Sequence, residues 1–146
     1  MKKQFAIMLF VLAGVLLVQS ASAQSLRFEQ VENSINKKGK YALLVSNSRH
    51  FHAAVMTGEE LKTKHPKIEF EIVLNGPIFK ELATDESLSP LINKNEKLNL
   101  RIVACEFAMK YLGVTKAQFS PFIETTPNAL TYLFGLQENG FKTITL

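Results

Sequence analysis

The sequence contains only one cysteine, Cys105, and no tryptophan. A single thiol cannot form an internal disulfide, so the fold must be held together by its hydrophobic core. The chain also has no Gly-rich phosphate loop, no Gly-x-Ser-x-Gly motif and no paired-carboxylate pattern. These absences argue against a nucleotide cofactor and against hydrolysis, and we expect the protein to carry no cofactor.

Clustered positive charge is absent as well. The formal net charge of +4 falls to +2 when Lys2 and Lys3 are set aside, and the other basic residues are scattered along the chain. Nucleic-acid-binding proteins instead concentrate lysine and arginine in a patch or stripe. The sequence therefore predicts no nucleic-acid partner.

The first residues have the pattern of a secretory signal peptide. Lys2 and Lys3 precede the apolar run Phe5–Val18, and the small residues Ala21–Ala23 follow as a cleavage site. An uncleaved anchor is the alternative, but this run is shorter than the ~20 residues of a spanning helix. Removal of the first 23 of the 146 residues leaves 123. We expect a periplasmic or secreted protein with no membrane segment after cleavage.

The remaining chain is expected to comprise a polar lead-in, residues 24–39, and one domain, residues 40–146. Within the domain, apolar stretches predict strands and the segments between them predict helices. The predicted strands are Tyr41–Ser46, Ile68–Leu74, a stretch from Leu98 to Val103, Phe122–Thr125 and Phe141–Leu146. Asn47–His50 is predicted to be a polar loop before a helix from about Phe51 to Lys64. This alternation is typical of a three-layer α/β/α fold with a mainly parallel sheet.

Cys105 lies where the third predicted strand ends and a helix closed by Gly113 begins. Ligands and reacting groups gather at the carboxyl ends of parallel strands. The first helical turn favours a thiolate, although the neighbouring Glu106 opposes it. We expect Cys105 to be displayed at this edge and to be the catalytic residue if the protein has one. The alternative is a buried cysteine that acts as a small hydrophobic residue.

Two polar segments are expected to lie at the same edge. Asn47, Arg49, His50 and His52 follow the first strand, and the Asn75-Gly76 turn follows the second. Arginine or histidine would favour the thiolate, and backbone N–H groups of the turn would bind an anion. The alternatives are solvated side chains and an ordinary turn. His50 and His52 could also hold a metal, but no third ligand is near in sequence, so no metal site is predicted.

Four segments resemble the DsrE-like family, which includes the DsrE, DsrF and TusD sulfur-relay proteins. They are KYALLVSN, EIVLNGP, LRIVACEFAMKYLGV and PNALTYLFGLQENGFKTITL, and they span most of residues 40–146. The resemblance implies a flavodoxin-like fold with about five strands and a homo-oligomer, either a trimer or a hexamer. It also implies that a cysteine after a central strand, here Cys105, carries persulfide sulfur. The family's relay proteins are cytoplasmic, whereas this chain has an export signal.

Two functions are consistent with these features. The first is sulfur handling through Cys105, as a persulfide carrier or sulfurtransferase-like protein that exchanges sulfur with a donor or acceptor protein. The second is a non-enzymatic oligomeric binding or assembly module with a structural cysteine. Most aromatic residues are expected in the core and some at subunit contacts, where aromatics are enriched. The candidates are Phe107, Tyr111, Phe119, Phe122, Tyr132 and Phe134.

Overall fold

The computed structural model describes residues 27–146 and divides the chain into two units, one up to Ser34 and one from Ile35 to Leu146. The predicted signal peptide lies outside the described residues. The described part of the first unit contains a short helix, α2 (Phe28–Asn33), within the predicted lead-in. Among residues 27–146, no helix has the length and apolar character needed to cross a membrane.

Within the described part of the second unit, five strands form one sheet in the order β4-β3-β2-β1-β5. All four neighbouring pairs are parallel, which confirms the predicted fold class. The strand order nevertheless differs from the 2-1-3-4-5 order of flavodoxin. The strands are β1 (Lys40–Val45), β2 (Glu69–Leu74), β3 (Arg101–Cys105), β4 (Glu124–Thr126) and β5 (Lys142–Thr145).

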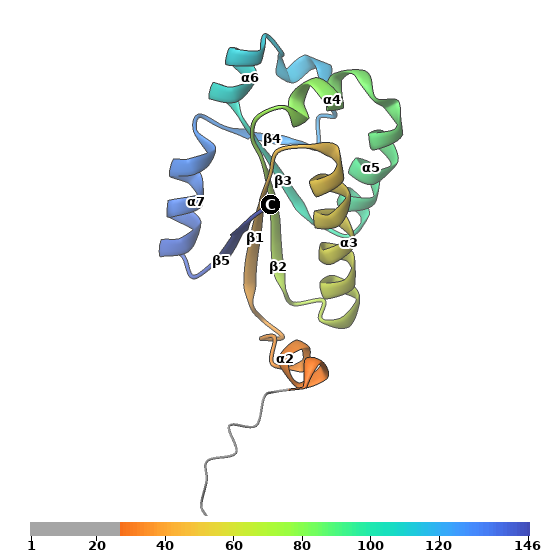
Figure 1. Ribbon diagram of the computed structural model, residues 1–146, viewed down its shortest axis with the longest axis vertical. Coiled ribbons are helices and arrows are strands. Elements are labelled where there is room, and N and C mark those ends of the chain that lie inside the picture. The colour runs from red at the N-terminus through yellow and green to blue at the C-terminus, as the bar shows by residue number, and fades with distance from the viewer. Residues whose placement is uncertain (1–26) are drawn as a thin grey trace, which may run out of the picture. The chain divides into compact units, whose positions relative to one another are not determined.

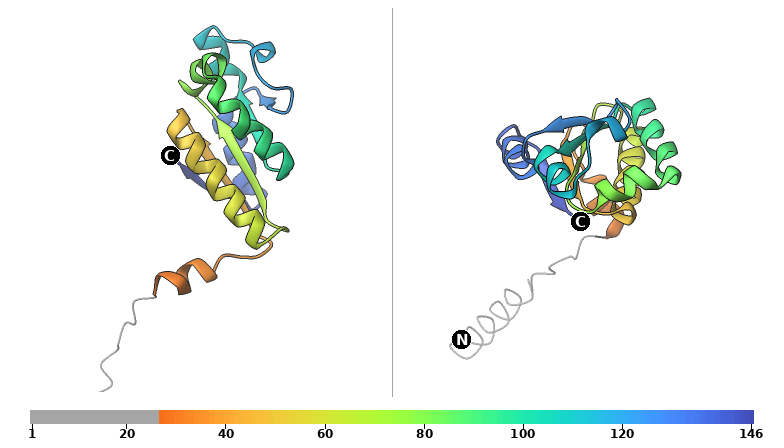
Figure 2. Two further views of the ribbon diagram at one scale, coloured as in Figure 1. Left: turned by 90° about the vertical axis from the view of Figure 1, so that its right-hand side faces the viewer. Right: turned by 90° about the horizontal axis from the view of Figure 1, so that it is seen from above.

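Helices lie on both faces of the sheet (Figures 1 and 2). Helix α3 contacts β1 and β2, α5 contacts β3, and on the opposite face α7 contacts β2, β3 and β5. Helices α4 and α6 lie near the end of the sheet where β3 finishes (Figure 1). The bounds are α3 (Ser48–Lys64), α4 (Ile78–Thr84), α5 (Ser89–Lys97), α6 (Glu106–Leu112) and α7 (Ala129–Glu138), with short 3-10 helices η1 (Glu86–Leu88) and η2 (Lys116–Gln118).

The alternation of side chains along β2 distinguishes the two faces of the sheet. Phe70 points toward α3, where a Cβ on Gly58 would lie only 3.0 Å from its ring. Glu71, the next residue, points to the other side and accepts a hydrogen bond from Tyr132 of α7. We call these the α3 face and the α7 face of the sheet.

Two sequence predictions about element boundaries are wrong. Ser48–His50 belong to α3 instead of a loop, because the Asn47 side chain accepts a hydrogen bond from the N–H of His50 and so caps the helix. Leu98 follows α5 instead of starting a strand. Asn99 then turns the chain with a φ of 53°, a left-handed conformation that asparagine tolerates.

Candidate functional site at the carboxyl edge of the sheet

The predicted residues after β1 are engaged mainly with one another and with α4. Besides capping α3, the Asn47 side-chain amide lies 3.1 Å from Nδ1 of His50. The N–H of Ser48 donates to Oε2 of Glu81 at 2.7 Å. A carboxylate of the protein therefore already occupies the amino end of α3, where an anionic ligand would otherwise bind.

Arg49 and His52 have exposed side chains on the first two turns of α3. The hydrogen bonds with Ser87, and to a smaller extent the charge of His52, lower the pKa of the exposed Asp85 carboxyl. Within residues 27–146, no three histidine, cysteine or acidic side chains gather closely enough to hold a metal ion.

The Asn75-Gly76 turn lies beside the end of β1. The N–H of Asn75 donates to the carbonyl of Val45 at 3.0 Å, and the N–H of Ile78 donates to that of Ser46 at 2.7 Å. Gly76 has a φ of 78°, which favours glycine. Since the Asn75 N–H extends the sheet, it is not available to an anion.

Cys105 is the last residue of β3 and the N-cap of α6, as the sequence predicts. Its side chain does not cap α6. Instead, Sγ accepts a hydrogen bond of 3.3 Å from the N–H of Ala129, the first residue of α7. The first N–H groups of a helix have no partner within it, so the sulfur satisfies a group that would otherwise be buried unpaired.

Cys105 lies at the carboxyl edge of the sheet, as expected, but the expectation that its thiol is exposed there is wrong. Cys105 is 3% exposed and belongs to the hydrophobic core. It is covered because α7, which begins 24 positions later in the chain, starts directly over the end of β3. The neighbouring Glu106 carboxylate accepts a hydrogen bond of 2.6 Å from the Thr125 hydroxyl in β4.

The structure thus separates the predicted residues into two groups at one sheet edge. Asn47, His50 and the Asn75-Gly76 turn lie where β1 leads into α3 and β2 leads into α4, whereas Cys105 is tied to the beginning of α7. Among the described residues, no hydrogen bond joins the Cys105 sulfur to an arginine or a histidine.

A polar cluster on the α7 face was missed by the sequence reasoning. Arg101 donates from Nε and Nη2 to the Glu124 carboxylate at 2.9 and 2.7 Å, and its Nη1 lies 3.5 Å from Oε1 of Glu71. The Tyr132 hydroxyl donates to Oε2 of Glu71 at 2.6 Å. The cluster therefore joins β2, β3, β4 and α7. Its one signal in the sequence is the pair of glutamates that alternate with apolar residues at the start of β2.

The charges in this cluster stabilise one another. The hydrogen bonds with Glu124 raise the pKa of Arg101, and those with Arg101 lower the pKa of Glu124. Burial and then the bond to Glu71 raise the pKa of Tyr132, which keeps the phenol protonated. Glu71, only 6% exposed, is compensated by two donors, as a buried carboxylate requires.

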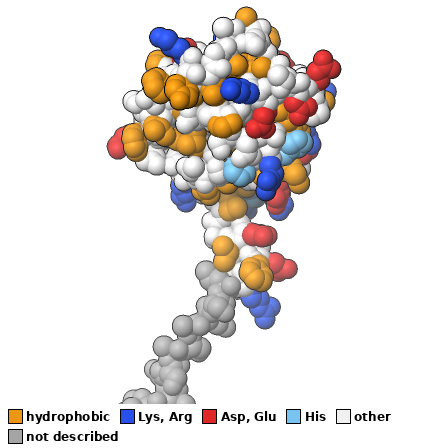
Figure 3. All heavy atoms as spheres, turned by 45° about the horizontal axis from the view of Figure 1, so that its top comes forward, with side chains coloured by type: hydrophobic (Ala, Val, Ile, Leu, Met, Phe, Trp, Pro, Cys, Tyr) orange, Lys and Arg blue, Asp and Glu red, His pale blue; other side chains and the backbone are white. Residues whose placement is uncertain are grey.

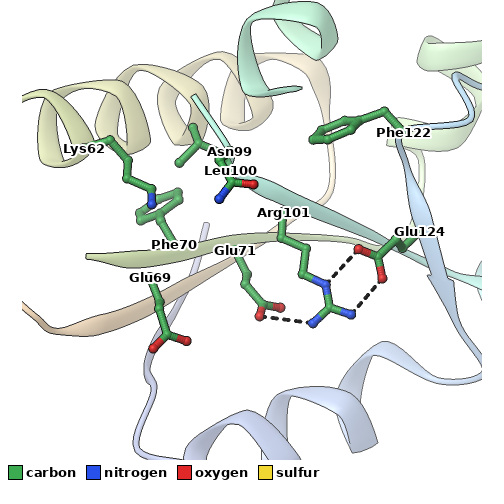
Figure 4. Close-up of a pocket in the computed structure, with 9 residues that line it drawn as sticks. All are labelled: Lys62, Glu69, Phe70, Glu71, Asn99, Leu100, Arg101, Phe122 and Glu124. Carbon is green, nitrogen blue, oxygen red and sulfur yellow. Dashed lines mark hydrogen bonds and ion pairs between the residues drawn. The ribbon is translucent and has the colours of Figure 1, made fainter. Parts of the chain in front are cut away.

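A pocket of about 330 Å³ lies at the amino ends of β2, β3 and β4, next to this cluster. Figure 4 shows Arg101 lying between Glu71 and Glu124, whereas Lys62 of α3, which also lines the pocket, lies beside Phe70. Because both sides of the Arg101 guanidinium face carboxylates of the protein, this residue is paired internally and has a structural role.

The comparisons with known proteins support the fold and add no activity. No family model matches the sequence, and no curated protein matches it significantly. The structure is similar to a protein of unknown function, MTH1491, from Methanobacterium thermoautotrophicum, with a TM-score of 0.67 and 12% identity over 74% of this chain and 99% of that one. It is also similar to BT1422 of Bacteroides thetaiotaomicron, a conserved protein of unknown function, with a TM-score of 0.64 and 19% identity over 78% and 100% of the two chains. At these low identities the comparison shows only that the proteins share the parallel α/β fold, and it says nothing about a shared function.

Proposed function

We propose that this protein is an exported, homo-oligomeric binding or assembly module of DsrE-like type, in which Cys105 has a structural role. The observation that carries the proposal is the environment of the thiol. Cys105 is 3% exposed, and its sulfur accepts the N–H of Ala129. A sulfur carrier needs a thiolate that a donor and then an acceptor can reach, because both steps are nucleophilic attacks on sulfur.

The test is the reactivity of the folded protein toward inorganic polysulfide, read as intact mass. We expect native protein to remain unmodified and urea-unfolded protein to gain sulfur on Cys105. Cys105→Ala is the matched control, since it should gain none in either state. Stoichiometric modification of the native protein would overturn the proposal.

The Ala129 contact favours a second candidate, sulfur handling through Cys105. The Ala129 N–H points at the sulfur from the first turn of α7, and the sulfur lies at the carboxyl edge of the sheet, where reacting groups gather. This function requires the first turn of α7 to move away from the sulfur. Under this candidate, native protein takes up sulfur from polysulfide and passes it to a small thiol, leaving Cys105 reduced.

Export and self-association are parts of the proposal with tests of their own. The residues that support export are the basic, apolar and small segments before Gln24. We expect the protein to be found in the periplasm or medium and to begin at Gln24. An intact Met1 would favour the uncleaved anchor, and a protein confined to the cytoplasm would contradict export. Sedimentation measurements of this mature protein would distinguish the trimer or hexamer implied by the resemblance from a monomer.

A further inference from the structure

Helices α6 and α7 each present two large apolar side chains to solvent. Phe107 and Tyr111 are 69% and 84% exposed on α6, and Leu130 and Phe134 are 52% and 66% exposed on α7. Each pair is spaced four residues apart, so its members lie on one side of their helix. We call these four residues the α6–α7 apolar surface.

The two pairs lie on helices whose amino ends are joined by hydrogen bonds. The N–H of Phe107 donates to the carbonyl of Pro127 at 3.2 Å, and Cys105 accepts the N–H of Ala129. The amino ends of α6 and α7 are therefore fixed against each other. Figure 3 shows apolar side chains gathered on the side of the molecule where these helices lie.

The area of this surface is comparable to what a specific contact needs. An aromatic side chain presents roughly 150–250 Å², so at these exposed fractions the three rings leave on the order of 400 Å² accessible. Two copies packed through them would bury on the order of 800 Å² before Leu130 and the rim are counted, and a specific interface needs about 1,000 Å². The largest apolar patch on a typical monomer covers about 300–600 Å² and is often functional, and this surface falls in that range.

We propose that a second copy of this chain docks on the α6–α7 apolar surface. The inference rests on the homo-oligomer of the proposed function and names its contact. The charges beside the surface favour self-association, because Glu106 and Lys110 are exposed, opposite in sign and one turn apart on α6. In a two-fold pairing with antiparallel α6 helices, which a hexamer of dihedral symmetry contains and a cyclic trimer lacks, Lys110 of each copy faces Glu106 of the other.

The test is the sedimentation behaviour of the mature chain at micromolar concentrations. We expect the unmodified protein to associate, and Tyr111→Glu or Phe134→Glu to weaken association roughly 30-fold or more, as expected at an interface hot spot. Both side chains are exposed, so circular dichroism should show an unchanged fold. Met56→Glu is the matched control: Met56 is 66% exposed on α3, so this variant should associate like the unmodified protein.

A charge exchange tests the orientation separately. Glu106→Lys and Lys110→Glu should each weaken association, and the double variant should restore it. An oligomer unaffected by Tyr111→Glu and Phe134→Glu, or equally disrupted by Met56→Glu, would overturn the proposed surface while leaving the homo-oligomer standing. A monomeric unmodified chain would overturn both.

Discussion

The α3 face and the α7 face of the same sheet are built in different ways. The α3 face packs against α3 and α5 with fully buried apolar residues such as Phe51, Val55 and Ile72. The α7 face carries the Glu71–Arg101–Glu124 cluster, and its helix leaves Leu130 and Phe134 exposed. The α3 face therefore supplies most of the apolar core, whereas the α7 face is held by an internally paired charged cluster and leaves apolar residues of its helix exposed, and these exposed residues are where interactions are expected.

The largest effect should come from the α3 face. Phe51 is fully buried, and Phe51→Ala should destabilise the fold by about 3–5 kcal/mol through lost burial and a cavity. Phe134→Ala, at 66% exposure, should change the stability of the monomer by no more than about 0.5 kcal/mol. Urea unfolding in a Tyr111→Glu background would measure both without a contribution from association. Similar losses for the two variants would contradict the difference between the faces.

Two glycines should respond in opposite directions. A Cβ on Gly58 would lie 2.8 Å from Cδ1 of Leu100, in the packed α3 face, so Gly58→Ala should cost about 1–3 kcal/mol. Gly135 is a helical position of α7 with nothing within 4 Å of the added atom. Gly135→Ala should therefore stabilise the fold by about 0.5–1 kcal/mol through helix propensity. Thermal unfolding of the two variants checks the signs, and the same sign for both would be evidence against this packing.

The hydrogen bond between Tyr132 of α7 and Glu71 of β2 should contribute less to the free energy of unfolding than the burial of Phe51 does. Tyr132→Phe removes the 2.6 Å hydrogen bond to the buried Glu71 carboxylate and keeps the ring. A hydrogen bond to a charged group contributes about 1.5–3 kcal/mol, and partial exposure of Tyr132 lowers the expected cost to about 1–2 kcal/mol. Equilibrium unfolding measures this cost. Met56→Ala, at an exposed position of α3 outside the α6–α7 apolar surface, is the control and should leave the stability nearly unchanged.

The smallest effect concerns pH. Arg101 lowers the pKa of Glu124 below its ordinary 4.5, so this pair stabilises the fold above pH 4.5 and loses its contribution as the pH falls through the lowered value. Both side chains are about half exposed, so Glu124→Gln should cost only a few tenths of a kcal/mol at pH 7. The cost should vanish in acid. An unfolding series from neutral to acid pH checks this, and a cost that grew as the pH fell would refute the pairing.

The succession of strands and helices along the chain could be predicted, because apolar periodicity and local turn and capping residues determine each element. Gly113 ends α6 with a φ of 70°, as expected, and Asn128 provides a local signal of the same kind by capping α7 through the N–H of Leu130. The two wrong boundaries lie after Asn47, where the chain is helical instead of a loop, and at Leu98, which ends a helix instead of starting a strand. Hydrophobicity alone does not decide between these conformations.

The sequence predicts where Cys105 lies in the fold, but it does not predict that the side chain is buried. That Cys105 ends β3 follows from local pattern, but its burial depends on α7, and the bond between Glu71 and Tyr132 spans 61 positions. Such contacts arise from the packing of elements distant in sequence. No local signal at Cys105 distinguishes a thiol at an open edge from one beneath a helix.

The rate at which a thiol reagent labels Cys105, measured as a function of urea concentration, tests the account most directly. If the sulfur is a buried structural partner of α7, labelling should be negligible in the native protein and should rise with urea in parallel with global unfolding. Rapid labelling that does not depend on urea would show an accessible thiol. That result would contradict the structural role of Cys105 and favour sulfur chemistry.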